Sequence, residues 1–251
     1  MSHERVHDEW MKAMKARRPS PAFEVMARTG ILEVTSPELA TLAEQLPSVW
    51  AASLDALDAC EAGPVVRHAA LFHRVAEYRS TEGVIADDTV RARESAAILD
   101  RFFRDYRYST EERETAAHLL RHLPFDYNSS WSDPDVRRFV RRIGLEHLEA
   151  LFELSRVTSG DDQLPELRAR IDALREGLVL SPKELAITGS DLMKALGAGP
   201  GPHLGEILRT LVERVTDDPS LNQPETLLAL GRELEPEARA NAPKRGKKPL
   251  E

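Results

Sequence analysis

Four arginines in one amphipathic segment are the side chains of this chain best suited to binding a charged ligand. They occupy positions i, i+1, i+4 and i+5 of that segment, as Arg137, Arg138, Arg141 and Arg142. On a helix this spacing gives one basic stripe opposite the apolar face of Phe139 and Val140. A planar guanidinium binds two phosphate oxygens at once, which favours contact with RNA. The alternative is a solvated face with ion pairs from Glu146 or Glu149, and composition alone favours neither interpretation.

A second arginine group lies in the segment 101–108, where Arg104 and Arg107 alternate with aromatic residues. Basic residues interleaved with aromatic rings are typical of surfaces that bind nucleic acid. We therefore include Arg104 and Arg107 among the candidate RNA-binding residues.

Histidines raise the question of metal chemistry. His118 and His122 are four residues apart, which places them on one face of a predicted helix and suits a shared metal ion. His68 and His73 lie on an apolar helix and are the plausible helpers. Histidines that simply pack in the core or lie on the surface are more common than such a cluster. We expect no metal ligands and no cofactor.

The sequence shows no group of carboxylates with the spacing that nucleotidyl transfer requires. Gly189-Ser190-Asp191 resembles the start of a nucleotidyltransferase Gly-Ser motif, but no acid follows it in the segment 193–202. We interpret Ser190 as the cap of a short helix. Adjacent acidic pairs, such as Asp217-Asp218, are typical of solvated turns and caps. We therefore expect no catalytic residues.

The segment 187–211 is the most distinctive in the chain. It predicts two short helices that meet at a turn rich in glycine and proline, with Pro202 opening the second helix. Gly201 belongs to the turn, and Gly205 would allow a ligand to approach the second helix closely. An open helix N-terminus is suited to binding an anion. On physical grounds alone, a tight corner between two helices is the more common explanation.

Helical periodicity extends over almost the whole chain, so the expected fold is all-α, an extended multi-helix array. Capping residues mark several helix starts, including Ser109 and Ser132, each followed three residues later by an acid. Helices are expected at 6–16, 22–29, 37–44, 49–59, 64–78, 88–105, 110–122, 133–143, 146–158, 164–176, 191–196 and 202–215. The last helix is expected at 224–234, followed by a disordered basic tail.

Composition limits the class of protein. The chain has 251 residues, a net charge of -8 and one cysteine, Cys60, which excludes an internal disulfide. No apolar stretch reaches the roughly 18 residues that a membrane-spanning helix needs, and the N-terminus lacks the apolar region of a signal peptide. We expect a cytoplasmic protein that does not bind membranes. The acidic balance argues against nucleic-acid binding over the whole surface but allows local basic patches.

Residues in the segment 187–228 strongly resemble the C-terminal region of bacterial tRNA nucleotidyltransferases (CCA-adding enzymes) and the related poly(A) polymerases. The matching positions are Ile187, Gly189, Asp191, Leu192, Pro200, Gly201, Pro202, Gly205, Ile207, Leu208, Asn222 and Glu225. Arg17-Arg18-Pro19-Ser20, followed by Gly30-Ile31-Leu32, resembles the family's segment just after its catalytic head. The resemblance covers about residues 5–235 and implies binding of RNA, in particular tRNA.

Two departures from the family qualify this resemblance. The catalytic head, which precedes this region in the family, is expected to be missing. Some members also carry an HD-type phosphohydrolase domain with metal-binding histidines and a bridging aspartate. At the corresponding positions this chain has Ala52, Arg74 and Arg91, and only His73 and His122 survive. An arginine in place of a bridging carboxylate puts positive charge where a cation should bind.

The resemblance therefore predicts four parts. They are a neck-like start (1–36), a degenerate HD-like domain (37–128), a helical RNA-binding-like tail (129–235) and a basic tail (236–251). The expected function is a body-and-tail module that binds tRNA, is catalytically silent alone and assists a separate nucleotidyltransferase head. The alternatives are an HD-type metal-dependent phosphohydrolase and a protein-interaction scaffold, so enzymatic activity stays an open question that leans towards none.

Overall fold

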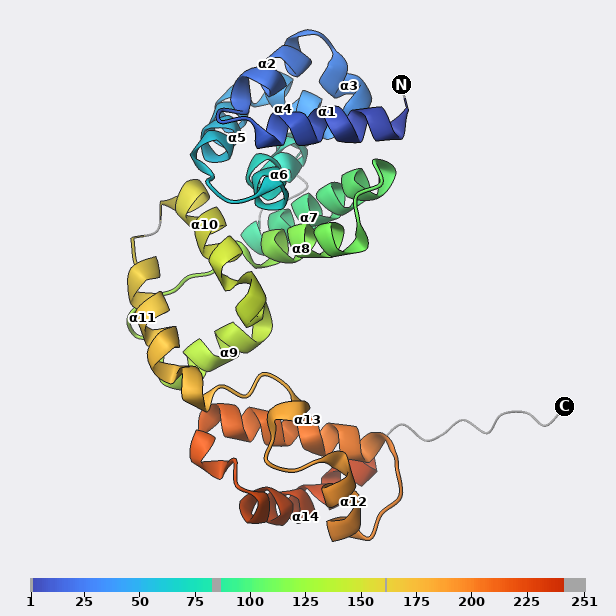
Figure 1. Ribbon diagram of the computed structural model, residues 1–251, viewed down its shortest axis with the longest axis vertical. Coiled ribbons are helices and arrows are strands. Elements are labelled where there is room, and N and C mark those ends of the chain that lie inside the picture. The colour runs from blue at the N-terminus through green and yellow to red at the C-terminus, as the bar shows by residue number, and fades with distance from the viewer. Residues whose placement is uncertain (1, 83–86, 161, 242–251) are drawn as a thin grey trace, which may run out of the picture. The chain divides into compact units, whose positions relative to one another are not determined.

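A computed structural model describes residues 2–82, 87–160 and 162–241 of the chain. These residues form fourteen α-helices, joined by turns and short 3-10 segments, with no strand among them (Figure 1). The expected all-α fold is confirmed. None of the helices in these ranges combines the length and apolar content required to cross a membrane.

Contacts between residues divide the chain into two compact units. The first comprises Met1–Tyr127 and Glu146–Leu164, and the second comprises Asn128–Leu145 and Pro165–Glu251. Each unit is therefore built from two separate stretches of sequence. The expected neck-like start and HD-like domain fall together in the first unit.

The first unit contains nine α-helices around an aromatic core. They are α1 (His3–Lys15), α2 (Ser20–Arg28), α3 (Ile31–Thr35), α4 (Pro37–Gln45), α5 (Pro47–Ala59), α6 (Pro64–Phe72), α7 (Asp88–Asp105), α8 (Thr110–His122) and α10 (Leu148–Ser159), with 3-10 segments at Val75–Glu82 and Leu145–His147. Trp10 of α1 is buried against Phe23, Phe72 and Phe102, with ring centroids 4.4–6.2 Å apart. Aromatic side chains bury large apolar areas, so this cluster is the centre of the unit's stability.

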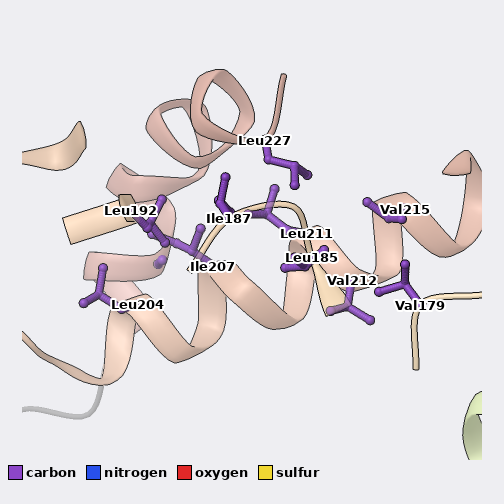
Figure 2. Close-up of a cluster of buried hydrophobic side chains, with 11 residues drawn as sticks. Val179, Leu185, Ile187, Leu192, Leu204, Ile207, Leu211, Val212, Val215 and Leu227 are labelled. Atoms are coloured by element: carbon purple, nitrogen blue, oxygen red, sulfur yellow. The ribbon is translucent and has the colours of Figure 1, made fainter. Parts of the chain in front are cut away.

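The second unit contains five α-helices: α9 (Asp133–Ile143), α11 (Leu164–Leu174), α12 (Gly189–Leu196), α13 (Pro202–Asp217) and α14 (Pro224–Asn241). Three 3-10 segments connect them, at Arg175–Gly177, Pro182–Glu184 and Pro219–Leu221. Aliphatic side chains of α12, α13 and α14 form its core, and Figure 2 shows Leu192, Ile207 and Leu211 within it. The buried face of α9 consists of Val136, Phe139, Val140 and Ile143.

Three of the helices expected from sequence match the structure to the residue, whereas others differ at one or both ends, such as the helix expected at 64–78, which ends at Phe72. The ranges 88–105, 110–122 and 133–143 are the bounds of α7, α8 and α9. Ser109 and Ser132 each form a reciprocal capping box, with Glu112 and Asp135 respectively. Both caps satisfy backbone N–H groups that would otherwise have no partner in the first turn.

Two local predictions were wrong. The cap of α12 is Thr188, which forms a capping box with Asp191, and Ser190 lies inside the first turn. The last helix, α14, continues past Leu234 to Asn241 although it contains Pro236. Ala238 is buried in the core at 4% exposure, and Glu235 pairs with Arg239 across one turn, so packing and an ion pair offset the proline. Residues 242–251 lie outside the described residues.

Candidate nucleic-acid interface

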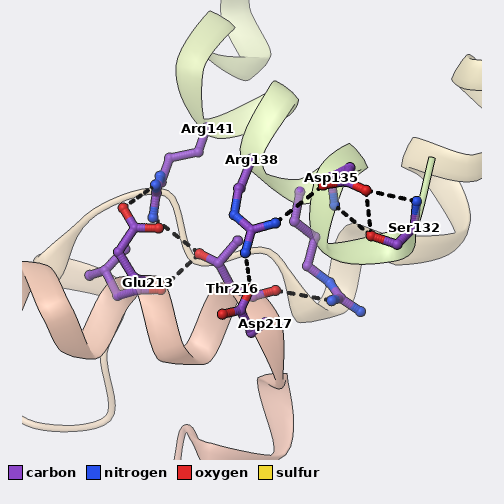
Figure 3. A network of polar contacts seen from close by, with 9 residues as sticks. Ser132, Asp135, Arg138, Arg141, Glu213, Thr216 and Asp217 are labelled. Carbon is purple, nitrogen blue, oxygen red and sulfur yellow. Dashed lines mark hydrogen bonds and ion pairs between the residues drawn. The ribbon is translucent and has the colours of Figure 1, made fainter. Parts of the chain in front are cut away.

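Three of the four stripe arginines contact the C-terminal turn of α13 (Figure 3). Arg137 donates from Nη1 to the Thr216 carbonyl at 3.0 Å. Arg141 donates to the Thr216 hydroxyl at 3.2 Å and pairs with Glu213. Arg138 pairs with Asp217 of α13 and with Asp135 of its own helix. The last carbonyls of a helix have no intrahelical partners and carry partial negative charge, so arginines from a neighbouring helix stabilise them.

The observed partners of the stripe differ from the expected ones. The sequence suggested partners in Glu146 or Glu149, whereas the observed carboxylates come from Glu213 and Asp217, which are distant in sequence. Arg142 is the exception. It is exposed, lies 5.8 Å from the centroid of the Phe139 ring, and has no carboxylate partner among the described residues. The proposed contact of these four arginines with RNA stays a prediction, and Arg142 is the one most available for it.

The second arginine group lies in the first unit and is built differently from the expectation. Arg104 pairs with Asp100 one turn earlier, and Arg107 pairs with Glu4 of α1. Phe102, Phe103 and Tyr108, which flank the two arginines, are core residues with 0–7% exposure. Tyr106, which lies between the arginines, is half-buried and donates its hydroxyl to the Thr35 carbonyl at 3.0 Å. The three buried rings have no free face for a base, and contact of Arg104 and Arg107 with RNA stays a prediction.

The helix corner in the second unit follows the sequence prediction closely. Gly197 ends α12 with a left-handed backbone (φ 58°), and Gly201 caps α13 in an extended conformation. The first turn of α13 contains no acidic residue. Its N-terminal N–H groups and helix dipole are therefore not neutralised by a carboxylate from that turn.

The glycines of this unit have distinct roles. Gly205 is exposed on α13, and a Cβ added there would meet no atom within 4 Å, so the outer face of the helix is open at this position. Gly201 has less room, because a Cβ there would lie 2.8 Å from Nδ1 of His203. Gly231 was not among the residues predicted from sequence, and a Cβ there would lie 2.6 Å from Cδ1 of Leu192. A glycine in the middle of an apolar helical repeat was the available signal for this close helix contact.

The histidine named as a possible metal ligand on α6 is committed to internal hydrogen bonds. Nδ1 of His68 lies 2.7 Å from the Pro64 carbonyl, which can only accept, so Nδ1 is the donor. Nε2 then accepts from the Tyr108 hydroxyl at 2.9 Å. Burial lowers the pKa of His68 from 6.5 to about 4. A neutral His68 is thus fully hydrogen-bonded, and the charged form is disfavoured.

Two of the other candidate ligands, His118 and His122, lie side by side with ring centroids 4.4 Å apart. Nδ1 of His73 donates to the Ala70 carbonyl, and Nδ1 of His122 donates to the His118 carbonyl. Burial also lowers the pKa of His73 to about 4. Within the described ranges, no group of three or more histidine, cysteine, aspartate or glutamate side chains is arranged to hold a metal ion.

A cavity of about 260 Å³ in the first unit is lined in part by His73, Arg74 and Arg91. Arg74 pairs with Glu77, and Arg91 pairs with Asp88. Two ion-paired arginines therefore stand at positions where the resemblance would require an aspartate and a histidine. A pair of guanidinium groups disfavours a bound cation.

Comparison with known proteins is consistent with these features. Residues 87–230 match the family model of tRNA nucleotidyltransferase domain 2, and residues 1–42 match the model described as "Probable RNA and SrmB-binding site of polymerase A". The CCA-adding enzyme of Geobacillus sp. (strain WCH70) is 36% identical over 105 residues, which is 41% of this chain and 24% of that enzyme. The CCA-adding enzyme of Streptococcus thermophilus (strain CNRZ 1066) is 25% identical over 128 residues, which is 51% of this chain and 30% of that enzyme.

The matched region spans less than a third of the length of either of these curated relatives. The family model, by contrast, covers more than half of this chain, from α7 to α14. It includes both the arginine-bearing helix α9 and the corner between α12 and α13. The chain therefore belongs to the tRNA nucleotidyltransferase family and corresponds to a region C-terminal to the family's catalytic head.

Proposed function

We propose that this chain is a tRNA-binding body-and-tail module of the tRNA nucleotidyltransferase family. The observation that carries the proposal is the match of residues 87–230 to the family model. The match of residues 1–42 to an RNA-binding model supports it from the other end of the chain.

The surface of α13 offers a plausible place for the RNA backbone. Its first turn has no carboxylate to neutralise the helix dipole, and Gly205 leaves the outer face of the following turn open. A phosphate near these N–H groups would be favoured by both hydrogen bonding and the dipole. Arg142 on α9 adds a guanidinium with no carboxylate partner among the described residues. Bound RNA is therefore expected mainly on the second unit.

We further propose that nucleotide addition requires a nucleotidyltransferase head, which the described residues do not supply. Nucleotidyl transfer requires carboxylates that hold Mg²⁺. The part of the chain that the structure describes has neither a strand to carry such a pair nor a metal-ready group of acids. Arg74 and Arg91, each of which pairs with a carboxylate, likewise support the interpretation of residues 37–128 as a degenerate HD-like domain.

Fluorescence anisotropy with an end-labelled tRNA transcript tests the binding proposal. We expect saturable binding that weakens steeply between 50 and 200 mM salt, because each phosphate contact releases counterions. Gly205→Glu should weaken binding by placing a carboxylate on the open face of α13. Ala51→Glu, at an exposed helical position in the first unit, is the matched control and should bind as the parent does. No binding of the parent at low salt would refute the proposal.

A further inference from the structure

A hollow of about 630 Å³ runs along one face of α9 in the second unit. It is lined by Trp131, Asp135, Arg138, Phe139, Arg141 and Arg142. Positions 135, 138, 139 and 142 follow the i, i+3, i+4, i+7 spacing of one helix face, and Trp131 lies one turn before them. The volume falls in the range of pockets that hold small organic ligands, about 300–1,000 Å³.

Trp131 is held at one end of this hollow by the turn that leads into α9. Its backbone N–H donates to the Asn128 carbonyl at 3.1 Å, and the next residue, Ser132, caps the helix. The indole meets the buried Phe139 ring edge to face, with centroids 5.6 Å apart. Trp131 is nevertheless partly exposed, whereas Trp10 and Trp50 are only 1% and 8% exposed.

The charged side chains around the hollow differ in whether another residue of the chain already binds them. Arg138 and Arg141 are engaged by Asp217 and Glu213, and Asp135 is engaged by the Ser132 cap. Arg142, exposed and positioned over Phe139, is the guanidinium of the hollow that has no carboxylate partner in the described part of the chain. The hollow therefore combines an aromatic side chain with one positive charge that is available to an anion.

We propose that this hollow receives one unpaired nucleotide of a bound RNA, with the base stacked on the Trp131 indole and a phosphate on Arg142. Unstacked bases in loops and at ends are recognised by stacking on aromatic side chains, and guanidinium groups bind the neighbouring phosphates. The inference deepens the proposed tRNA-binding function and rests on it. It names a contact, Trp131, that the spacing of basic residues alone does not indicate.

Intrinsic fluorescence gives a direct test, because Trp131 is the most exposed of the three tryptophans. A short single-stranded oligoribonucleotide should quench the parent's emission, and Trp131→Phe should abolish most of that quenching. Phenylalanine keeps a stacking face, so Trp131→Phe should bind labelled tRNA within a few-fold of the parent. Trp131→Ala should bind about tenfold more weakly, in line with the loss of one stacked base.

Arg142 provides the second arm of the experiment. Arg142→Ala should lower the salt slope of tRNA binding by about one unit, and Arg142→Lys should keep the slope. Circular dichroism of each variant checks that the helices are intact. If the parent binds tRNA and both alanine variants bind with unchanged affinity and salt slope, the hollow is only a packing feature and the inference is wrong. If the parent fails to bind tRNA at low salt, the proposed function itself fails.

Discussion

Replacing Arg137 by methionine should destabilise the second unit more than the same replacement of Arg142. Methionine keeps an apolar stem of similar length, so the change mainly removes the guanidinium. Arg137 donates to the Thr216 carbonyl, which lies in the last turn of α13 and has no intrahelical partner. Arg142 is exposed, and its closest described contact is the face of Phe139.

The magnitude follows from these contacts. A hydrogen bond from a charged donor contributes about 1.5–3 kcal/mol. Nε of Arg137 is buried without a hydrogen-bond partner in the described ranges, so its removal relieves a penalty of about 1 kcal/mol. The net loss for Arg137→Met is therefore about 0.5–2 kcal/mol. For Arg142→Met we expect about 0.5 kcal/mol, because its distance from the ring is near the limit of a cation–π contact.

Urea denaturation followed by circular dichroism measures the difference. With a slope of about 2 kcal/mol per molar urea, Arg137→Met should lower the midpoint by roughly 0.25–1 M. A chain with two compact units can depart from a single two-state transition, so tryptophan emission is recorded beside circular dichroism; Trp131 reports on the second unit, and Trp10 and Trp50 report on the first. Equal midpoints for Arg137→Met and Arg142→Met would refute the assignment of Arg137 to the end of α13.

Further outcomes are expected for His68, for two glycines, and for metal content and nucleotide addition. The His68 ring should titrate with an NMR-measured pKa well below 6.5, because burial lowers it to about 4; an apparent pKa near 6.5 would contradict this. Between pH 6.5 and pH 4 His68 is protonated in the unfolded chain but neutral in the folded one. The contribution of His68 to the free energy of unfolding is therefore fully present above pH 6.5, and it falls by up to about 3 kcal/mol towards pH 4. Gly205→Ala should raise the melting temperature, since helical glycine costs roughly 0.5–1 kcal/mol relative to alanine. Gly231→Ala should lower it, since the added Cβ meets Leu192; the opposite order would contradict the packing described. Purified protein should contain less than one equivalent of transition metal and should not add labelled CMP to tRNA lacking its 3′ end. Elemental analysis and label incorporation test these two statements, and a positive result in either would count against the proposed function.

Helix positions were predictable because their signals are local. Ser109 and Ser132 act on N–H groups three residues away, so the capping boxes could be identified from sequence spacing alone. The end of α14 was not predictable in this way. Pro236 is an ordinary signal for a helix end, and only the burial of Ala238 against distant residues outweighs it.

For the candidate site too, prediction from local sequence stops at tertiary contacts, as the arginine stripe shows. Its position on α9 and its separation from the apolar face followed from the 3.6-residue period. Its partners did not, because Glu213, Thr216 and Asp217 lie in another helix, and no local pattern connects α9 with the end of α13. Local spacing therefore indicates which side chains share a face, whereas tertiary contacts decide which of them stay available for a ligand.

Arg137 and Arg142 consequently have separable roles. Arg137 reaches the Thr216 carbonyl at the end of α13 and is not part of the hollow's lining. Arg138, Arg141 and Arg142 line the hollow beside Trp131, but Arg138 and Arg141 also pair with Asp217 and Glu213 of α13. Removing all four arginines would disturb α13 and the hollow together, and weaker tRNA binding would then have two explanations. Arg142 is the position where charge can be removed with the least disturbance to α13, so its salt slope is the informative measurement. A reduced slope for Arg142→Ala with an unchanged urea midpoint would mean that one helix both stabilises the unit through Arg137 and contacts RNA through Arg142.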